Sequence, residues 1–188
     1  AHLHGVQVVG GSNPLAPTNQ SNGLARERQA VFFFPERNRA IVRMIDPRIG
    51  EIVYDPATGT AGFLVAAFDH IKLANSSTHG IKVVELDGKT VRRGHGDNLS
   101  AGKWNLLQTG TFFGNDVDAK MVRLATMNLT LRGLPDVRIL HRNALTTTLD
   151  AARKIELGLP VEGFQVILAN PPFSGRVDKD RIVEDVKV

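Results

Sequence analysis

An asparagine, two prolines and a phenylalanine follow directly on a short apolar run near the end of the sequence. The run, residues 166–169, predicts a buried strand because it is uniformly apolar and stops at turn residues. The side-chain oxygen of Asn170 and the carbonyl of Pro171 can accept hydrogen bonds from both N–H groups of a planar amine such as that of adenine. These contacts would aim the nitrogen lone pair at a methyl donor, and Phe173 can stack on the base. We therefore predict a catalytic role for Asn170, Pro171, Pro172 and Phe173; the alternative is a strand end with a proline-stiffened turn.

A glycine-containing loop earlier in the chain has the character of a nucleotide site. Residues 51–55 predict a short strand, residues 56–62 a loop and residues 63–71 an apolar helix. Glycines let the backbone approach a ligand, and the helix N-terminus offers free N–H groups. The loop is not a P-loop, because no Gly-Lys-Ser or Gly-Lys-Thr follows. The residues that we expect to contact a cofactor here are Asp55, Pro56, Ala57, Thr58, Gly59, Thr60, Gly62 and Phe63.

Two further predicted strands end in polar side chains. Residues 111–116 predict a strand that ends in an acid. The carboxylate of Asp116 is placed to bind both hydroxyls of a ribose, whereas we expect Asp118 to cap the helix that follows. Residues 137–141 predict the next strand, and Asn143 in the loop after it can contact the edge of an adenine or serve as an ordinary turn residue.

For the remaining segments the sequence predicts mainly secondary structure. Residues 1–30 show no periodicity and predict an irregular N-terminal segment. Pro35 suits the first turn of a helix that ends before Pro47. Residues 82–91 predict a hairpin, and residues 148–159 predict a helix.

Composition and charge limit the class of protein. The 188 residues suffice for one domain with a substantial core. No apolar run approaches the length of a membrane span, and the lack of cysteine excludes disulfides and thiolate metal sites, which is compatible with the cytoplasm. The formal net charge of +4 mildly favours a polyanionic partner. Just beyond the predicted hairpin, Arg92, Arg93 and His95 can contact phosphate or form a solvated charge cluster.

A set of motifs is present in four segments, DPATGTAGF (residues 55–63), GNDVD (114–118), MNL with LRGL (127–134) and NPPF (170–173). Together they resemble the N6-adenine DNA methyltransferases, and most closely the modification subunit of type I restriction–modification systems. The resemblance extends over about residues 30–175. The sequence departs from the family pattern at three positions: Phe34 replaces a frequent threonine, Ala61 stands where glycine is common, and Asn143 stands where an acid is usual.

The resemblance implies a cofactor and a way to hold it. S-adenosylmethionine would be bound by the glycine loop, with its ribose on Asp116 and its adenine near Asn143 and Ala144. Phe34 and Pro35 would lie near the methionine end of the cofactor. We expect no dedicated metal.

These observations predict an α/β, Rossmann-like fold of the S-adenosylmethionine-dependent methyltransferase type, with a mostly parallel, incomplete sheet and a hairpin insertion. Residues 31–188 would form a partial catalytic domain after the irregular residues 1–30. The first and fourth predicted strands, residues 51–55 and 166–169, would lie side by side. The fourth would be an uncovered edge through which the chain could associate with itself.

The predicted function is site-specific methylation of adenine N6 in DNA, as part of a restriction–modification system. The resemblance implies DNA, a specificity subunit and a restriction subunit as partners, no membrane partner, and a cytoplasmic location. One alternative is methylation of RNA or of a protein glutamine, because the Asn-Pro-Pro-aromatic motif serves those reactions too. The other is a non-catalytic fragment that binds the cofactor or has a structural role.

Overall fold

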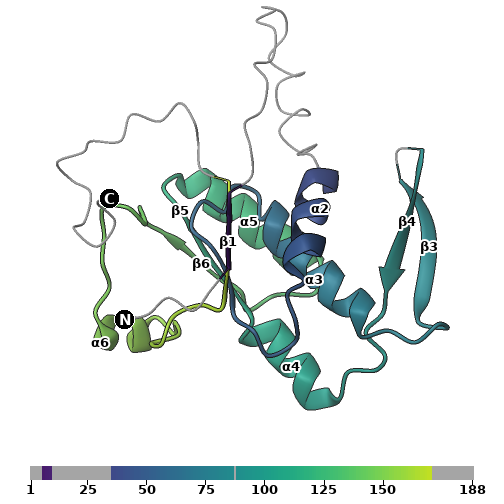
Figure 1. Cartoon of the computed structure of the whole chain (residues 1–188). Coiled ribbons are helices and arrows are strands. Elements are labelled where there is room, and N and C mark those ends of the chain that lie inside the picture. The colour runs from purple at the N-terminus through teal and green to yellow at the C-terminus, as the bar shows by residue number, and fades with distance from the viewer. Residues whose placement is uncertain (1–5, 10–34, 87, 171–188) are drawn as a thin grey trace, which may run out of the picture.

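Five parallel strands form the central sheet of the computed structural model, which describes residues 6–9, 35–86 and 88–170 (Figure 1). Their order is β1-β7-β2-β5-β6, and an antiparallel pair, β3-β4, forms a separate ribbon. The strands of the sheet are β1 (Val6–Val9), β2 (Val53–Asp55), β5 (Phe112–Asp116), β6 (Arg138–His141) and β7 (Val166–Ala169). The remaining elements are α2 (Pro35–Ile45), α3 (Gly62–Ala74), β3 (Ile81–Leu86), β4 (Lys89–Gly94), α4 (Ala101–Thr109), α5 (Ala119–Leu131) and α6 (Ala151–Glu156). The predicted α/β class, with a mostly parallel sheet and a hairpin insertion, is confirmed.

The hydrophobic core is organised around α3 and one face of the sheet. Most of α3 is apolar, so that Leu64, Phe68 and Ile71 are buried in one cluster with strand residues such as Val53. Phe68 also packs edge-to-face on Phe112 of β5, with the ring centroids 6.1 Å apart. Full burial of a side chain of this size contributes about 1.5–3 kcal/mol to the stability of the folded state. The helix therefore holds the loop that precedes it in place on the sheet.

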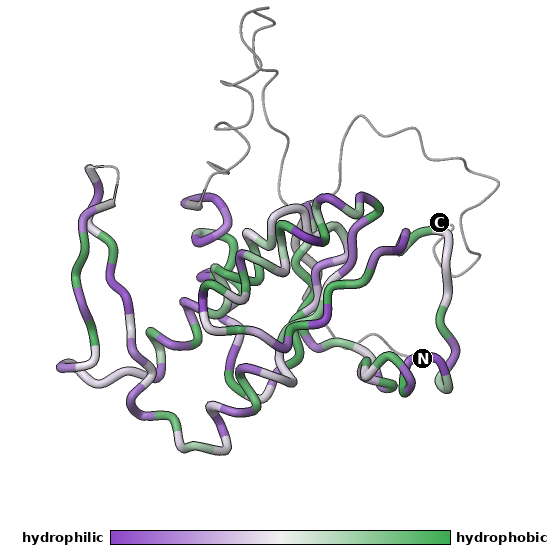
Figure 2. The backbone as a smooth tube through the Cα atoms, turned by 180° about the vertical axis from the view of Figure 1, so that it is seen from behind, coloured by the Kyte–Doolittle hydropathy of each residue, from purple (hydrophilic) through white to green (hydrophobic). Residues whose placement is uncertain are grey.

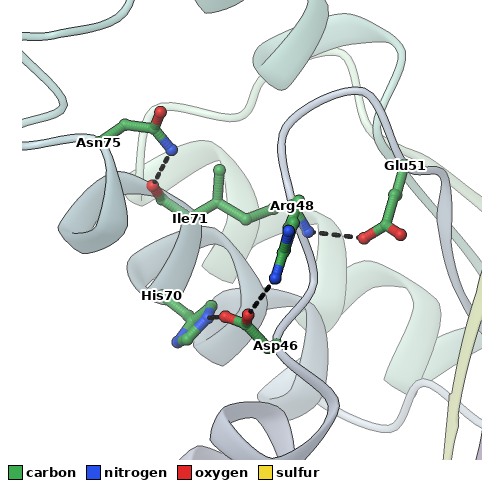
Figure 3. A network of polar contacts seen from close by, with 6 residues as sticks. All are labelled: Asp46, Arg48, Glu51, His70, Ile71 and Asn75. Atoms are coloured by element: carbon green, nitrogen blue, oxygen red, sulfur yellow. Dashed lines mark hydrogen bonds and ion pairs between the residues drawn. The ribbon is translucent and has the colours of Figure 1, made fainter.

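A polar network fixes the C-terminal end of α2 to α3 (Figure 3). Asp46 follows α2 in the left-handed conformation, with φ 52°. Its carboxylate lies 2.8 Å from Nε2 of His70 in α3 and accepts a 3.2 Å hydrogen bond from Arg48. Hydrogen bonding from His70, and next from Arg48, holds the pKa of Asp46 below its usual value. These contacts join the end of α2 to α3.

The first and fourth predicted strands pair as expected. They correspond to β2 and β7, which run parallel with Val53 opposite Val166 and Tyr54 opposite Ile167. Because parallel strands end at the same edge, the loop after β2 and Asn170 after β7 emerge side by side.

Two predictions about the rest of the sheet are wrong. Residues 1–30 are not irregular throughout, because residues 6–9 form β1, which pairs in parallel with β7 from Val6 opposite Val166 to Val9 opposite Ala169. The three valines of this short segment suit a strand, but they become one only beside a partner that is distant in sequence. Since β7 has β1 on one side and β2 on the other, it is not an uncovered edge. The physical basis for self-association through β7 is therefore absent.

α6 is shorter than the helix predicted over residues 148–159. It begins after Asp150, whose carboxylate accepts a 2.7 Å hydrogen bond from the backbone N–H of Arg153. Beyond its end, Gly158 adopts a left-handed φ of 65° that stops the helix. Among the helices that the structure describes, none is long and apolar enough to cross a membrane.

Candidate functional site

The loop after β2 folds over the end of β5 and is held there by a buried threonine. The backbone N–H of Thr58 donates to the carbonyl of Asn115 at 2.9 Å. Its hydroxyl lies 3.0 Å from that carbonyl and 3.0 Å from the carbonyl of Asp55. Thr58 is buried, so these contacts replace water for polar groups that would otherwise lack partners. These contacts hold the loop against the end of β5.

A glycine in β5 makes this close approach possible. A Cβ on Gly114 would clash with Oγ1 of Thr58 and lie 3.0 Å from the carbonyl oxygen of Asp55. A side chain at this position would push the glycine loop away from the strand.

Gly114→Ala should lower the free energy of unfolding by about 1–3 kcal/mol, the usual cost of forcing extra volume into a packed site. Gly102→Ala is the matched control, because a Cβ at this exposed position in α4 meets nothing within 4 Å and alanine favours helix. Urea unfolding of both variants measures the difference. Equal stability of the wild type and Gly114→Ala would show that the loop does not depend on the close contact.

Asp116 at the end of β5 connects the loop to the neighbouring strand ends. One carboxylate oxygen accepts a 2.8 Å hydrogen bond from the N–H of Gly59, and the other accepts a 2.9 Å bond from the N–H of Asp118. Its backbone carbonyl accepts a 3.0 Å hydrogen bond from the backbone N–H of Arg142, just after β6. Each carboxylate oxygen has a further lone pair, and the side chain is only partly buried, so the group can still accept hydrogen bonds from two hydroxyls. The expectation that Asp118 caps α5 is confirmed by the 2.8 Å bond that its side chain accepts from Lys120.

The N-terminus of α3 has backbone N–H groups without a side-chain cap. Ala61, the N-cap residue, adopts a left-handed φ of 66°, which explains why glycine suits this position. It is fully buried and its N–H donates to the carbonyl of Thr58 at 2.8 Å. Asn128 in α5 donates to the carbonyl of Thr60 at 2.9 Å. Because no side chain caps α3, its first-turn N–H groups can bind an anionic or carbonyl group.

Asp55 at the end of β2 is the most perturbed acid of the site. It is 1% exposed, and its carboxylate accepts a 3.0 Å hydrogen bond from the N–H of Ala57. Burial raises the pKa of Asp55 to about 7, and the nearby charge of Asp116 adds to the effect. The group therefore changes its charge near neutral pH.

The other predicted residues lie at the same edge of the sheet with different exposures. Asn143 is partly buried, and its side-chain oxygen accepts a 2.9 Å hydrogen bond from the N–H of Leu145, which is the turn contact expected of a loop asparagine. Phe63 is 4% exposed and belongs to the core, so that a ligand could reach only its backbone. Asn170 is exposed directly after β7. Partly buried positions next to these are Pro56, Ala57, Gly59, Thr60, Gly62 and Ala144.

The N-terminal end of α2 reaches the glycine loop. α2 begins at Pro35, and Nδ2 of Asn38 lies 2.5 Å from where a Cβ on Gly62 would stand. Phe34, Pro171, Pro172 and Phe173 fall outside the described residues, so their predicted roles are not tested.

Sequence reasoning missed a pair of side chains on the other face of the sheet, the partly buried Tyr54 and the buried Asn115. The hydroxyl of Tyr54 donates to Oδ1 of Asn115 at 2.8 Å, and the ring of Tyr54 stacks on Phe164 with centroids 4.2 Å apart. Burial raises the pKa of Tyr54. Nδ2 of Asn115 has no hydrogen-bond partner among the described residues. No local sequence pattern predicts the Tyr54–Asn115 contact, because the two residues belong to different strands. The contact from Asn128 to the glycine loop had a signal in the sequence, since Asn128 lies within one of the motif segments.

The sequence profile described as N-6 DNA Methylase matches residues 23–188. The chain belongs to this family. Its fold is accordingly that of the S-adenosylmethionine-dependent methyltransferases, as predicted. The match spans both the glycine loop and β7, the strand that Asn170 follows.

Several proteins similar to the chain are named as parts of type I restriction systems. The chain is 33% identical over 158 residues to the methylase subunit of the type I restriction enzyme EcoEI from Escherichia coli; the match covers 83% of this chain and 25% of that protein. It is similar to the solved modification subunit of a putative type I restriction enzyme from Vibrio vulnificus YJ016, with 28% identity, a TM-score of 0.57, and coverage of 88% and 30% of the two chains. A chain solved to explain assembly and conformational transition in a type I restriction–modification system has 30% identity, a TM-score of 0.54, and coverage of 84% and 26%. The chain thus spans about a quarter of the length of the EcoEI methylase subunit.

Proposed function

We propose that this chain forms the cofactor-binding and base-binding part of a DNA methyltransferase that methylates N6 of adenine. The principal supporting observation is the hydrogen bond from the N–H of Gly59 in the glycine loop to the carboxylate of Asp116. Asn170 lies at the same edge of the sheet, because it follows β7 and β7 pairs with β2. A ligand at this edge would be reached by groups from the ends of several strands at once.

The residues present fit S-adenosylmethionine. Asp116 retains lone pairs for the two ribose hydroxyls, and Asn143 stands at the next strand end for the adenine. The glycine loop from Asp55 to Gly62 and the uncapped first turn of α3 offer backbone N–H groups and a buried carboxyl to the methionine part. When bound, the cofactor supplies an activated methyl group.

The chain's own task in the reaction is to hold the target amine. The side-chain oxygen of Asn170 and the carbonyl of Pro171 would accept the two N–H groups of adenine, which directs the lone pair of the nitrogen toward the methyl group. Phe173 would stack on the base. Since an adenine paired in a duplex cannot reach such a pocket, the base must first leave the helix, at a cost of a few kcal/mol.

The proposed partners follow from the relatives. The chain would act on DNA together with a specificity subunit and a restriction subunit, in the cytoplasm. The naming of the relatives as type I methylase or modification subunits favours DNA over RNA or a protein glutamine as the substrate.

Asp116→Ala should weaken S-adenosylmethionine binding by about 1.5–3 kcal/mol, the scale of hydrogen bonds to a charged group. Asp136→Ala removes an exposed aspartate away from the site and should leave the affinity unchanged. Isothermal calorimetry on the wild type and both variants tests this expectation, with thermal unfolding as a check that Asp116→Ala is folded. Equal affinities in all three proteins would remove Asp116 from the cofactor site, and failure of the wild type to bind would contradict the proposed function.

A further inference from the structure

The β3-β4 ribbon extends from the rest of the protein as two paired strands (Figure 1). Its antiparallel register places Lys82 opposite Arg93 and Val83 opposite Arg92. The base of the ribbon is packed closely on α3, because a Cβ on Gly94 would lie 2.5 Å from Cα of Leu73. Figure 2 shows hydrophilic and hydrophobic residues interspersed along both strands. The ribbon therefore has an anchored base and exposed strands.

The exposed side chains of the ribbon are mainly cationic. Lys82, Lys89, Arg92 and Arg93 are all exposed, against the single acid Glu85 within the two strands. Lys82, Arg92 and Arg93 have no ion-pair partner among the residues that the structure describes. Their charge is therefore available to an external partner.

The ribbon stands at the same side of the protein as the candidate site. Nζ of Lys89, next to the ribbon's turn, pairs with Oε2 of Glu36 at 2.6 Å. Glu36 belongs to the first turn of α2, and Asn38 of the same helix lies beside Gly62 of the glycine loop. α2 adds Arg39 and Arg43 to the positive charge of this region. A polyanion bound along the ribbon would thus pass close to the edge where Asn170 is exposed.

We propose that the β3-β4 ribbon, with the adjoining part of α2, binds the phosphate backbone of a DNA duplex next to the adenine that enters the site. This inference rests on the proposed function, and it identifies which surface of the chain holds the DNA. Contacts to phosphates come mainly from Arg and Lys side chains, and a two-stranded ribbon has a suitable width for a DNA groove. The core of a protein–protein interface is poor in charged residues, whereas Val83 is the one large apolar side chain that the described part of the ribbon exposes. Charge complementarity therefore favours DNA as the partner.

The test is the salt dependence of duplex binding by the protein in its active assembly. A fluorescent duplex of mixed sequence is a sufficient probe, because phosphate contacts do not depend on the base sequence. Arg92→Gln/Arg93→Gln should make the slope of log affinity against log salt shallower by about 0.9–1.8, since each phosphate contact contributes about 0.9 and these adjacent side chains project from opposite faces of the ribbon. Arg92→Lys/Arg93→Lys should largely retain the slope. Lys103→Gln/Arg123→Gln removes the same charge from exposed positions on α4 and α5 and should leave the slope unchanged.

Three results would overturn the proposal: an unchanged slope in Arg92→Gln/Arg93→Gln, an equal change in the control pair, or intact duplex binding with loss of a partner subunit. The last would assign the ribbon to a protein interface. S-adenosylmethionine binding, measured by calorimetry on the same proteins, should be equal in all variants. If the wild type binds the duplex through the ribbon but does not bind S-adenosylmethionine, the proposed function fails while the DNA contact stands.

Discussion

Asn170→Ala is expected to lower the rate of methyl transfer by roughly 10²–10³-fold while affinity for S-adenosylmethionine stays nearly unchanged, the usual loss for one preorganised hydrogen-bonding group. The side-chain oxygen of Asn170 would act on the adenine amine as positive charge develops on that nitrogen, so its contribution appears in the transition state. Its exposed position directly after β7, beside the strand that leads into the glycine loop, suits this role. Single-turnover kinetics and calorimetry together separate the two quantities.

The measurement requires an active assembly with its DNA and specificity partner, so that a low rate can be attributed to the substitution. Asn105→Ala makes the same chemical change at an exposed position of α4 and should leave the rate intact. Undiminished methyl transfer in Asn170→Ala would show that the motif after β7 is structural, and the proposed chemistry would then fail at its central residue.

Asp55→Asn should stabilise the protein at about pH 8 and have little effect at about pH 4. The pKa of Asp55 is raised to about 7 in the folded protein, from about 3.9 in an unfolded chain. The folded state therefore binds the proton more tightly, and wild-type stability falls as pH rises from about 4 to about 7 and then levels off. Three pKa units correspond to a loss of at most about 4 kcal/mol in the free energy of unfolding of the wild type. Asparagine avoids this loss because it is neutral, and its side-chain oxygen can still accept the hydrogen bond from the N–H of Ala57.

Urea unfolding across this pH range measures the difference between Asp55→Asn and the wild type. Asp97 provides a control of opposite sign, because the hydrogen bond from Ser77 lowers its pKa in the folded protein. Its contribution is present above the unfolded pKa and is lost as pH falls, so Asp97→Asn should destabilise at neutral pH and have little effect in acid. A pH-independent difference for Asp55→Asn would show that burial does not perturb this carboxyl.

The strands and the loop of the site could be predicted because local signals agreed with one another. The apolar runs before Asp55, Asp116 and Asn170 each ended at polar or turn residues, and the βαβ rule then placed the first and fourth runs side by side. Asp118 was identifiable as a cap from its position alone.

The features that escaped prediction depend on contacts between distant parts of the chain. Nothing near residues 6–9 shows that they will pair with β7. The bond between Thr58 of the glycine loop and Asn115 of β5, and that between Tyr54 of β2 and Asn115, join segments that are distant in sequence and leave no periodic signal. The backbone of Ala61 is held left-handed by the loop around it, against the preference of alanine itself.

The pairing of β1 with β7 also constrains the order in which the sheet is assembled. It joins the first and last described strands, so Val6 must wait for Val166 to be synthesised before their hydrogen bonds can form. Closing so long a stretch of chain carries an entropic cost, which favours late formation of this contact, after the nearer strands have docked on α3. During synthesis on the ribosome, the valine strand would remain without its partner until almost the whole of the described chain has emerged.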